Sequence, residues 1–386
     1  MWRPRHLAAA FDGREAPHEV DVAIYLPSLG EGGIERVYLN LAQELVRRTL
    51  RVDLLVAQLD GARSAEVPPG ARVVDLAAPS RRTLSLFPGL VRYLRSTQPA
   101  ALLACSNLNL VALWTRIFSH PTTRIIITIH NHLSTQFANL PVRHRWVLRP
   151  VMALSYSRAD AIVAVSAQVA DDLSRFLGLE RTRIDVIYNP VLTDAALQTK
   201  DEPIEHPWFA EAQPPVILGA GRLIARKDYA TLLRAFALVR QQRAARLVIV
   251  GEGEERPHLE RLVHKLGCES DVSLPGFVAK PFPYFSRAKL FVLSSRWEGL
   301  PTNVVEAMAC GCPVVATDCP GGGREILEGG RLGRLVPVGD AESMAEAMIM
   351  TLDEPRLSDR LSSRAMDFHV DRIVDQYLRI LHCEQE

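Results

Sequence analysis

Two glutamates stand eight residues apart in the stretch Ser294-Ser-Arg-Trp-Glu-Gly-Leu-Pro-Thr-Asn-Val-Val-Glu306. Glu298 lies in a segment containing glycine and proline, which is typical of a loop, and its carboxylate could accept hydrogen bonds from the hydroxyl groups of a sugar. Glu306 occupies the third position of a predicted helix if Asn303 caps that helix, so a capping box is an alternative to a binding role. The spacing leaves both interpretations open.

Two cations lie five residues apart in Gly221-Arg-Leu-Ile-Ala-Arg-Lys-Asp228, directly after a predicted strand. Arg222 and Lys227 at the carboxyl edge of a sheet could offset the charge that develops on a departing diphosphate, which is otherwise a task for a metal ion. The chain contains no Asp-x-Asp pair to hold such a metal. The alternative is that Lys227 and its neighbour Arg226 lie on a solvent-exposed surface and bind nothing.

Two glycine loops, Gly30-Glu-Gly-Gly33 and Gly251-Glu-Gly253, each follow a predicted strand. Neither has the third glycine of a dinucleotide-binding fingerprint, because Glu35 and Arg256 stand at that position, and this argues against a dehydrogenase. The first loop opens a predicted helix, so its backbone N–H groups could bind a diphosphate. A tight strand-to-helix turn is the alternative.

His130 ends a β-branched run that begins at Ile125. A lone histidine is often structural, but its place at the end of a strand favours a binding or catalytic role.

Short β-rich apolar runs alternate with helical patterns, which is typical of parallel sheets with crossover helices. The predicted strands are Val20–Pro27, Arg51–Gln58, Ala71–Leu76, Ala101–Cys105, Arg124–Ile129, Ala161–Val165, Ile184–Ile187, Val216–Ala220, Arg246–Val250, Val272–Leu274, Leu290–Ser294, Pro313–Ala316 and Gly333–Val336. Between them Thr199–Pro215 has the composition of a linker. We therefore predict two doubly wound α/β domains, residues 1–190 and 191–368, which face each other across a cleft.

The charges are balanced overall, with 45 Lys and Arg against 44 Asp and Glu in 386 residues, which argues against a nucleic-acid-binding surface. They are nevertheless uneven, because no acidic residue lies between Asp75 and Asp160. That interval contains ten arginines: Arg81, Arg82, Arg92, Arg95, Arg116, Arg124, Arg143, Arg145, Arg149 and Arg158. The segment from Arg143 to Arg149 includes Trp146, as in a basic amphipathic helix on lipid headgroups. A core helix with a solvated arginine face is the alternative.

No segment approaches the ~20 apolar residues that cross a bilayer, because two asparagines interrupt the best candidate, Ala100–Trp114. The six cysteines are expected to be reduced thiols, and Cys310-Gly-Cys312 lacks a second ligand pair for zinc. These observations favour a cytoplasmic protein without a structural metal.

The motifs together resemble those of the retaining glycosyltransferases of family 4, which have the GT-B fold. The resemblance extends from Leu29-Gly-Glu-Gly-Gly-Ile-Glu-Arg36 to the terminal helix Ile373–Leu381, and it is most specific in the paired-glutamate stretch between Phe291 and Asp318. It implies a donor-binding domain at residues 191–368. It also implies an acceptor-binding domain at residues 1–190, onto which a helix at residues 369–386 crosses back.

The resemblance also implies roles for individual residues. His130, Glu298, Arg222 and Lys227 would be catalytic, with His130 beside the reacting sugar. The donor nucleotide sugar would be held by Gly32, Gly33, Arg222, Lys227, Gly251, Phe277, Val278, Glu298, Gly299, Leu300, Pro301, Thr302 and Glu306. Within this set Glu306 would bind the ribose hydroxyls, and the segment Gly276-Phe277-Val278 would contact the base.

The activity implied is transfer of a hexose from a nucleoside-diphosphate sugar, expected to be a UDP-sugar, with retention and no essential metal. The acceptor would be a glycan or a lipid-linked glycan in cell-surface polysaccharide synthesis, reached from the inner face of an anionic membrane through Arg143, Arg145, Trp146 and Arg149. A nucleotide-sugar epimerase and a non-catalytic nucleotide-sugar-binding subunit are the alternatives, and the presence of His130, Glu298 and Glu306 favours transfer.

Overall fold

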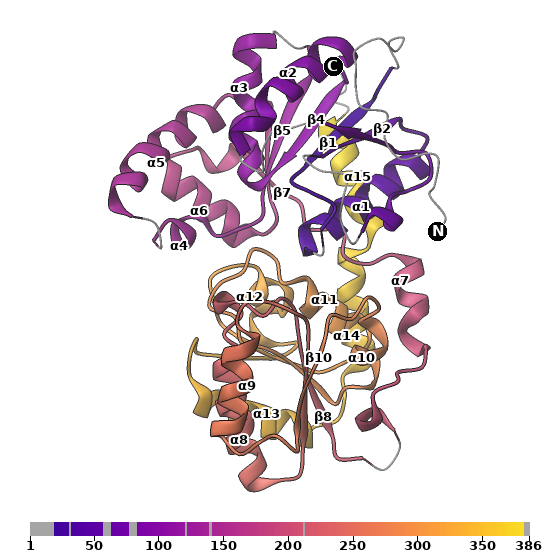
Figure 1. Cartoon of the computed structure of the whole chain (residues 1–386), viewed down its shortest axis with the longest axis vertical. Coiled ribbons are helices and arrows are strands. Elements are labelled where there is room, and N and C mark those ends of the chain that lie inside the picture. The colour runs from indigo at the N-terminus through magenta and orange to yellow at the C-terminus, as the bar shows by residue number, and fades with distance from the viewer. Residues whose placement is uncertain are drawn as a thin grey trace. The chain divides into compact units, whose positions relative to one another are not determined.

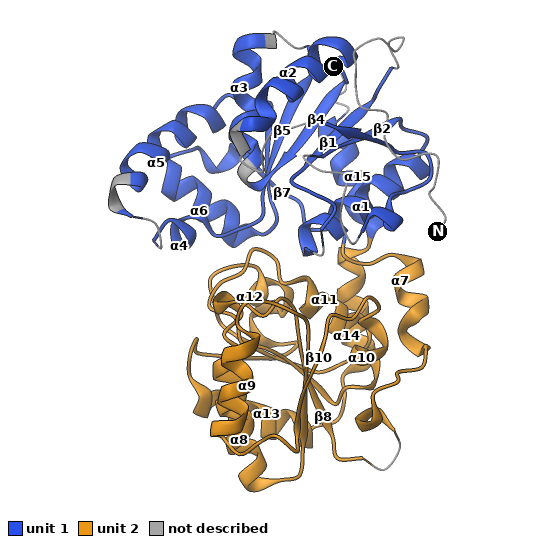
Figure 2. Ribbon diagram, in the orientation of Figure 1, with its two compact units in different colours: residues 1–190, 370–386 blue, residues 191–369 orange. Residues whose placement is uncertain are grey.

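A computed structural model of the chain describes residues 19–30, 32–56, 63–76, 83–119, 122–138, 141–210 and 213–381. The chain forms two compact units (Figures 1 and 2). Unit 1 comprises residues 1–190 and 370–386, and unit 2 comprises residues 191–369. Each unit is built around one parallel β-sheet with helices between successive strands. The prediction of two doubly wound α/β domains is therefore confirmed.

The sheet of unit 1 has seven strands in the order β3-β2-β1-β4-β5-β6-β7. Their bounds are β1 Val22–Leu26, β2 Val52–Val56, β3 Arg72–Asp75, β4 Ala101–Cys105, β5 Arg124–Ile129, β6 Ala161–Ala164 and β7 Ile184–Val186. Strands covered on both faces are almost continuously apolar, and Ile125, Ile126 and Ile127 of β5 are fully buried. The strand order reverses between β1 and β4, where the carboxyl ends of a doubly wound sheet bind ligands.

The helices of unit 1 include one from the end of the chain. They are α1 Gly33–Arg47, α2 Phe87–Thr97, α3 Asn109–Ser119, α4 Leu133–Ala138, α5 Val142–Tyr156, α6 Ala167–Leu177 and α15 Val370–Leu381. Helix α15 contributes Ile373 and Tyr377 to the apolar core that α1 also lines. Arg47 of α1 forms an ion pair with Asp371 at 2.8 Å. The terminal helix is thus an integral part of unit 1.

The sheet of unit 2 has six strands in the order β10-β9-β8-β11-β12-β13. The strands are β8 Val216–Ala220, β9 Arg246–Val250, β10 Val272–Gly276, β11 Leu290–Leu293, β12 Val314–Thr317 and β13 Arg334–Val336. The helices are α7 Asp194–Gln198, α8 Tyr229–Gln242, α9 Arg256–Lys265, α10 Phe282–Arg287, α11 Thr302–Ala309, α12 Gly323–Ile326, α13 Ala341–Asp353 and α14 Ser358–Ala365. Here the order reverses between β8 and β11.

Within the segment expected to be a linker, Thr199–Pro215, residues 199–210 and 213–215 are described, and they are more ordered than the composition indicates. The described part contains two 3₁₀ turns, Thr199–Asp201 and Pro207–Phe209, and makes hydrogen bonds to other elements of unit 2. Ser286 Oγ donates a hydrogen bond to the carbonyl oxygen of Lys200 at 2.6 Å, and His206 Nε2 lies 3.0 Å from Ser273 Oγ. Tertiary hydrogen bonds, which composition does not reveal, fix this segment.

Candidate active site

Two glycine loops meet at the carboxyl edge of the unit 2 sheet. Gly221 and Gly251 follow β8 and β9 with φ angles of +136° and +141°, which L-residues with a side chain rarely adopt. A Cβ atom at Gly251 would overlap the carbonyl oxygen of Gly221, and Gly221 N donates to Val250 O at 2.9 Å. Gly251, expected to contact the donor, therefore also has a packing reason to be glycine.

A buried ion pair lies at this edge. Lys227, in the 3₁₀ turn Ala225–Lys227 after β8, places Nζ 2.6 Å from Oε1 of Glu298 in the loop after β11. The side chains of Lys227 and Glu298 are only 12% and 6% exposed. Ser295 Oγ donates to the same carboxylate oxygen at 2.6 Å, and the Arg226 guanidinium lies 4.0 Å from Oε2. The structure thus brings together two of the four residues expected to be catalytic.

The charge of Glu298 is set by this environment. Burial alone raises the pKa of its carboxyl, but the positive charges of Lys227 and Arg226 lower it. Hydrogen bonds from Lys227 and Ser295 lower it further, and the pKa of Glu298 lies below its ordinary value. Glu298 is therefore ionised at neutral pH and can accept hydrogen bonds but cannot donate them.

The loop that contains Glu298 is supported by the segment after β12. Glu298 N donates to Pro320 O at 2.9 Å, and Gly322 N donates to Gly299 O at 2.7 Å. Gly321 has a φ of +126°, and a Cβ atom there would overlap the Glu298 carbonyl oxygen. These contacts fix the backbone that presents Glu298. Residues 299–301 are buried and Thr302 is half-buried.

The capping-box interpretation of Glu306 is wrong. Helix α11 begins at Thr302 after Pro301, so Glu306 is its fifth residue rather than its third. Asn303 does not cap the helix, because its side-chain amide donates to the carbonyl oxygen of Ala220 at 2.7 Å and so joins α11 to the end of β8. Glu306 is buried, at 4% exposure, on a helix held against this edge of the sheet.

The remaining residues expected to bind the donor in unit 2 lie at the surface. Arg222 is exposed directly after β8. Phe277, after β10, is 45% exposed, and Val278 is half-buried. An exposed aromatic ring beside the strand ends is available for a planar ligand group. The described contacts do not bring Arg222 to Glu298, in contrast to Lys227.

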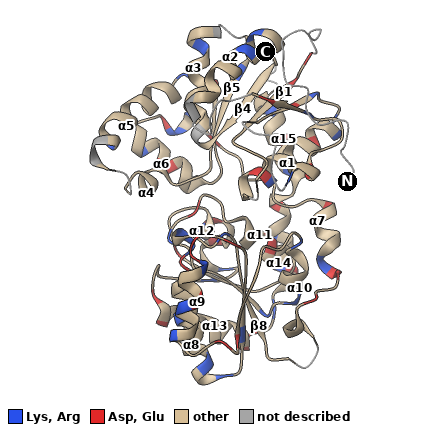
Figure 3. Ribbon diagram, viewed as in Figure 1, with Lys and Arg blue, Asp and Glu red and all other residues tan. Residues whose placement is uncertain are grey.

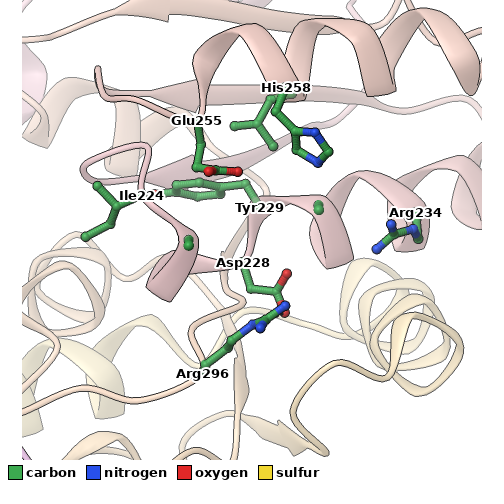
Figure 4. Close-up of a pocket in the computed structure, with 10 residues that line it drawn as sticks. Ile224, Asp228, Tyr229, Arg234, Glu255, His258 and Arg296 are labelled. Carbon is green, nitrogen blue, oxygen red and sulfur yellow. Dashed lines mark hydrogen bonds and ion pairs between the residues drawn. The ribbon is translucent and has the colours of Figure 1, made fainter. Parts of the chain in front are cut away.

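A hollow of about 200 Å³ is lined in part by Ile224, Ala225 and Asp228, which are close to Lys227 in the sequence (Figure 4). Its lining includes Asp228, Arg234 and His258, and Arg296 Nε lies 3.2 Å from Asp228 Oδ2. None of the residues predicted from the sequence to bind the donor lines it. The candidate site is therefore the cluster around Lys227 and Glu298 rather than this hollow.

In unit 1, Gly32 and Gly33 lie at the start of α1, as expected. Gly32 precedes the first turn with a φ of −68° and has no side-chain cap. The carboxyl group of Glu35 lies where a Cβ atom of residue 32 would be. The Glu35 carboxylate therefore lies beside the first turn of α1, where its negative charge would oppose an anion at these N–H groups.

His130 lies at the end of β5 in unit 1 and is 6% exposed. Its Nε2 atom is 2.9 Å from the hydroxyl of Tyr38 on α1 and 3.1 Å from Oγ1 of Thr128. Burial lowers the pKa of His130 to about 4, so its imidazole is neutral at physiological pH. A neutral imidazole can accept or donate a hydrogen bond, but it carries no charge to stabilise a phosphate.

Helix α5 carries the residues predicted to contact a membrane. Trp146 is 78% exposed, Arg149 Nε donates to Phe176 O at 2.6 Å, and Arg145 donates to Ala138 O. The side chain of Arg143 lies outside the described part, as do Arg81 and Arg82. The described helices include none that is both long and apolar enough to span a bilayer. Figure 3 shows basic residues on α2, α3 and α5, which by sequence are arginines.

Two family models match the chain, Glycosyltransferase Family 4 over residues 31–195 and Glycosyl transferases group 1 over residues 214–354. The chain belongs to glycosyltransferase family 4. The glycosyltransferase matches the N-acetylgalactosamine-N,N'-diacetylbacillosaminyl-diphospho-undecaprenol 4-alpha-N-acetylgalactosaminyltransferase of Campylobacter jejuni with 26% identity over 377 residues, which cover 93% of the chain and 99% of that protein. It is also 32% identical over 234 residues to the lipopolysaccharide core biosynthesis glycosyltransferase LpsE of Rhizobium meliloti, covering 59% of the chain and 66% of LpsE.

The fold of this glycosyltransferase is shared with solved structures. Anabaena Alr3699/HepE in complex with UDP-glucose matches with a TM-score of 0.76 and 20% identity, covering 94% of the chain and 99% of HepE. WaaG, a glycosyltransferase involved in lipopolysaccharide biosynthesis, matches with a TM-score of 0.71 and 16% identity, covering 93% and 99%. The expected GT-B fold is confirmed.

Several polar residues that contact the candidate site residues of the glycosyltransferase were not predicted from the sequence. Ser295 was passed over although it bonds Glu298, and so were Tyr38 and Thr128, which contact His130. Tyr229 was also missed: its buried hydroxyl has no hydrogen-bond partner in the described part and lies above Gly221 beside the Lys227 side chain. Of these residues, only Ser295 could have been recognised from the sequence as a partner of Glu298, because it lies three residues before Glu298 in the same loop.

Proposed function

We propose that the chain transfers a sugar from a UDP-sugar to a lipid-linked or glycan acceptor, with retention at the anomeric carbon and without an essential metal, in cell-surface polysaccharide or glycoconjugate synthesis. The buried cluster of Lys227, Arg226 and Glu298 carries this proposal, because it places cations and one ionised carboxylate at a sheet edge. The HepE complexes with UDP and UDP-glucose support the donor. The name of the Campylobacter relative, which includes a diphospho-undecaprenol, supports the acceptor.

In the proposed reaction, cationic side chains bind the diphosphate and carboxylate side chains bind hydroxyl groups of the donor. Lys227 and Arg222 offset the negative charge that grows on the leaving diphosphate. Glu298, which is ionised, accepts hydrogen bonds from hydroxyl groups of the donor sugar, and Glu306 accepts them from the ribose. No carboxylate is assigned as a covalent nucleophile, so we favour a same-face substitution in which the leaving phosphate takes the acceptor's proton.

The surface of α3 and α5 supports peripheral contact with a membrane at the cytoplasmic face. All exposed large apolar side chains of unit 1, among the residues described there, lie on these two helices: Trp114, Ile117, Phe118, Trp146, Val147 and Leu154. The helices contact each other, and Trp114 Nε1 donates to Ser155 Oγ at 3.1 Å. The same two helices carry Arg116, Arg145 and Arg149, and apolar side chains together with arginines suit an interface of acyl chains and anionic headgroups.

Nucleotide binding and transfer test the enzymatic part of the proposal. In a thermal-shift screen with UDP, GDP and ADP, UDP should stabilise the protein most, by about 2.7 kcal/mol at 100 times its dissociation constant. Incubation with UDP-sugars and lipid-diphosphate glycans should then yield a glycoside with the same anomeric configuration as the donor sugar. Addition of EDTA should leave the rate of sugar transfer unchanged. Release of an epimerised donor sugar would favour the epimerase alternative, and tight UDP binding without turnover would favour the binding subunit.

Sedimentation with liposomes tests the membrane contact. The protein should sediment with anionic vesicles at low salt and be released as salt rises, because screening weakens surface charge interactions. Replacing Arg143, Arg145 and Arg149 with Glu should abolish sedimentation and leave UDP binding intact. The charge-matched control replaces Arg261, Arg331 and Arg360, which are exposed in unit 2, with Glu. Equal loss in both triple variants would show that net charge alone matters and would contradict the assigned face.

A further inference from the structure

Two hydroxyl groups and an imidazole form a hydrogen-bonded chain between α1 and β5 in unit 1. The Tyr38 hydroxyl contacts Thr128 Oγ1 and lies 2.9 Å from His130 Nε2, and Thr128 Oγ1 lies 3.1 Å from the same nitrogen. Tyr38 and Thr128 are fully buried. Thr128 Oγ1 also donates to the carbonyl oxygen of Ala104 on β4 at 3.0 Å. The side chains of Tyr38, Thr128 and His130 therefore each have a defined hydrogen-bond partner.

The number of available protons determines the direction of these hydrogen bonds. A carbonyl oxygen only accepts, so the single hydroxyl proton of Thr128 belongs to its bond with Ala104. Thr128 must then accept from Tyr38, which uses the single proton of the phenol. The remaining contacts, from His130 Nε2 to Tyr38 and Thr128, need a proton on Nε2. A neutral imidazole with a proton on Nε2 has an unprotonated Nδ1.

We propose, resting on the proposed function, that Tyr38 and Thr128 are positioning residues that hold His130 as its Nε2–H tautomer, so that Nδ1 accepts a hydrogen bond from a hydroxyl group of the bound substrate. His130 Nδ1 is buried and has no hydrogen-bond partner among the described residues. A buried acceptor without a partner is costly, and a ligand hydroxyl that reaches it gains a complementary site.

The surroundings of the ring support this role. The Tyr38 and His130 rings meet edge to face with centroids 5.5 Å apart, which restricts rotation of the imidazole. Burial lowers the pKa of His130 to about 4, so the ring remains neutral and Nδ1 keeps its lone pair throughout the physiological range. Tyr38 also lies on the helix that begins at Gly33, so the ring and the first turn of α1 are fixed by one element.

Nitrogen NMR of histidine-labelled protein tests the tautomer without substrate. In the ligand-free wild type, long-range proton–nitrogen correlations of His130 should show a protonated Nε2 and an unprotonated Nδ1. Tyr38→Phe and Thr128→Val should each give a mixture of the two neutral tautomers. Thr128→Ser, which keeps the hydroxyl, should restore the wild-type pattern. The matched control is Tyr25→Phe, because the Tyr25 hydroxyl is equally buried in unit 1 but has no partner among the described residues.

Kinetics distinguish positioning from a merely structural role. Tyr38→Phe should lower kcat roughly 10-fold, the equivalent of one hydrogen bond, with little change in KM for the donor, whereas Tyr25→Phe should change neither. A protonated Nδ1 in the wild type, or a Tyr38→Phe variant with unchanged tautomer and unchanged kcat, would overturn the proposal. If the tautomer is as expected but the wild type transfers no sugar, the proposed function fails while the hydrogen-bond assignment stands.

Discussion

Neutralising Lys227 should destabilise the protein in a pH-dependent way, because Glu298 would remain buried without its cation. We consider Lys227→Met, Glu298→Gln and the double variant. In Lys227→Met the nearest remaining cation is Arg226, whose guanidinium is 4.0 Å from Glu298 Oε2. A buried carboxylate that loses its cation takes up a proton rather than stay charged, so the cost of that protonation limits the destabilisation.

The magnitude follows from the protonation equilibrium of an ordinary glutamate, whose pKa is about 4.3. At pH 7.5, protonating Glu298 on folding costs about 4 kcal/mol, and at pH 5 it costs about 1 kcal/mol. These values lie near the range of about 3–5 kcal/mol for breaking one side of a buried pair. For a domain of this size they correspond to losses in Tm of roughly 8–16 °C at pH 7.5 and 2–4 °C at pH 5.

The double variant serves as the control, since it contains neither charge. Differential scanning fluorimetry from pH 5 to 7.5 should show a large, pH-dependent loss for Lys227→Met and a small, constant change for Lys227→Met with Glu298→Gln. Sugar transfer should fall by roughly 10² or more in all three variants, because the double variant restores stability without restoring charge at the diphosphate. A loss of Tm in Lys227→Met that is the same at both pH values would refute the buried, ionised Glu298.

Three further outcomes follow from the structure. Arg222→Ala should lower transfer by roughly 10² while leaving Tm unchanged in fluorimetry, because Arg222 is exposed; an unaltered rate would remove it from the site. The pKa of His130 is about 4 in the folded protein and about 6.5 in the unfolded chain, because the buried imidazole resists protonation. The free energy of unfolding is therefore highest above pH 6.5 and falls as the pH is lowered toward 4. The Tm of His130→Gln should therefore depend less on pH than that of the wild type in calorimetry, and parallel curves would contradict the neutral buried ring. Gly321→Ala should reduce both soluble yield and transfer, since its Cβ would overlap the Glu298 carbonyl oxygen, and wild-type values for both would disprove the close approach.

The strands could be predicted from the sequence because burial on both faces makes them apolar runs. The bounds expected for β4, β5, β8 and β9 are those of the structure. The start of α11 could not be predicted, since Asn303 has the side chain of a helix cap but bonds Ala220, which is 83 residues away. The same limit applies to Tyr38, whose partner His130 is 92 residues distant. Local patterns reveal which segments are buried, whereas hydrogen bonds between distant segments depend on the completed fold.

The place of α15 has a consequence for how the protein is made. Residues 191–369 are all synthesised before Val370, so unit 2 has its complete sequence while unit 1 still lacks a helix. Until α15 leaves the ribosome, the face of α1 that it covers stays open to water and to other chains. The first half of the polypeptide therefore finishes folding last. A nascent chain stopped shortly before residue 370 would contain the complete sequence of unit 2 and an incomplete, aggregation-prone unit 1, so the correct folding of unit 1 depends on residues 370–381.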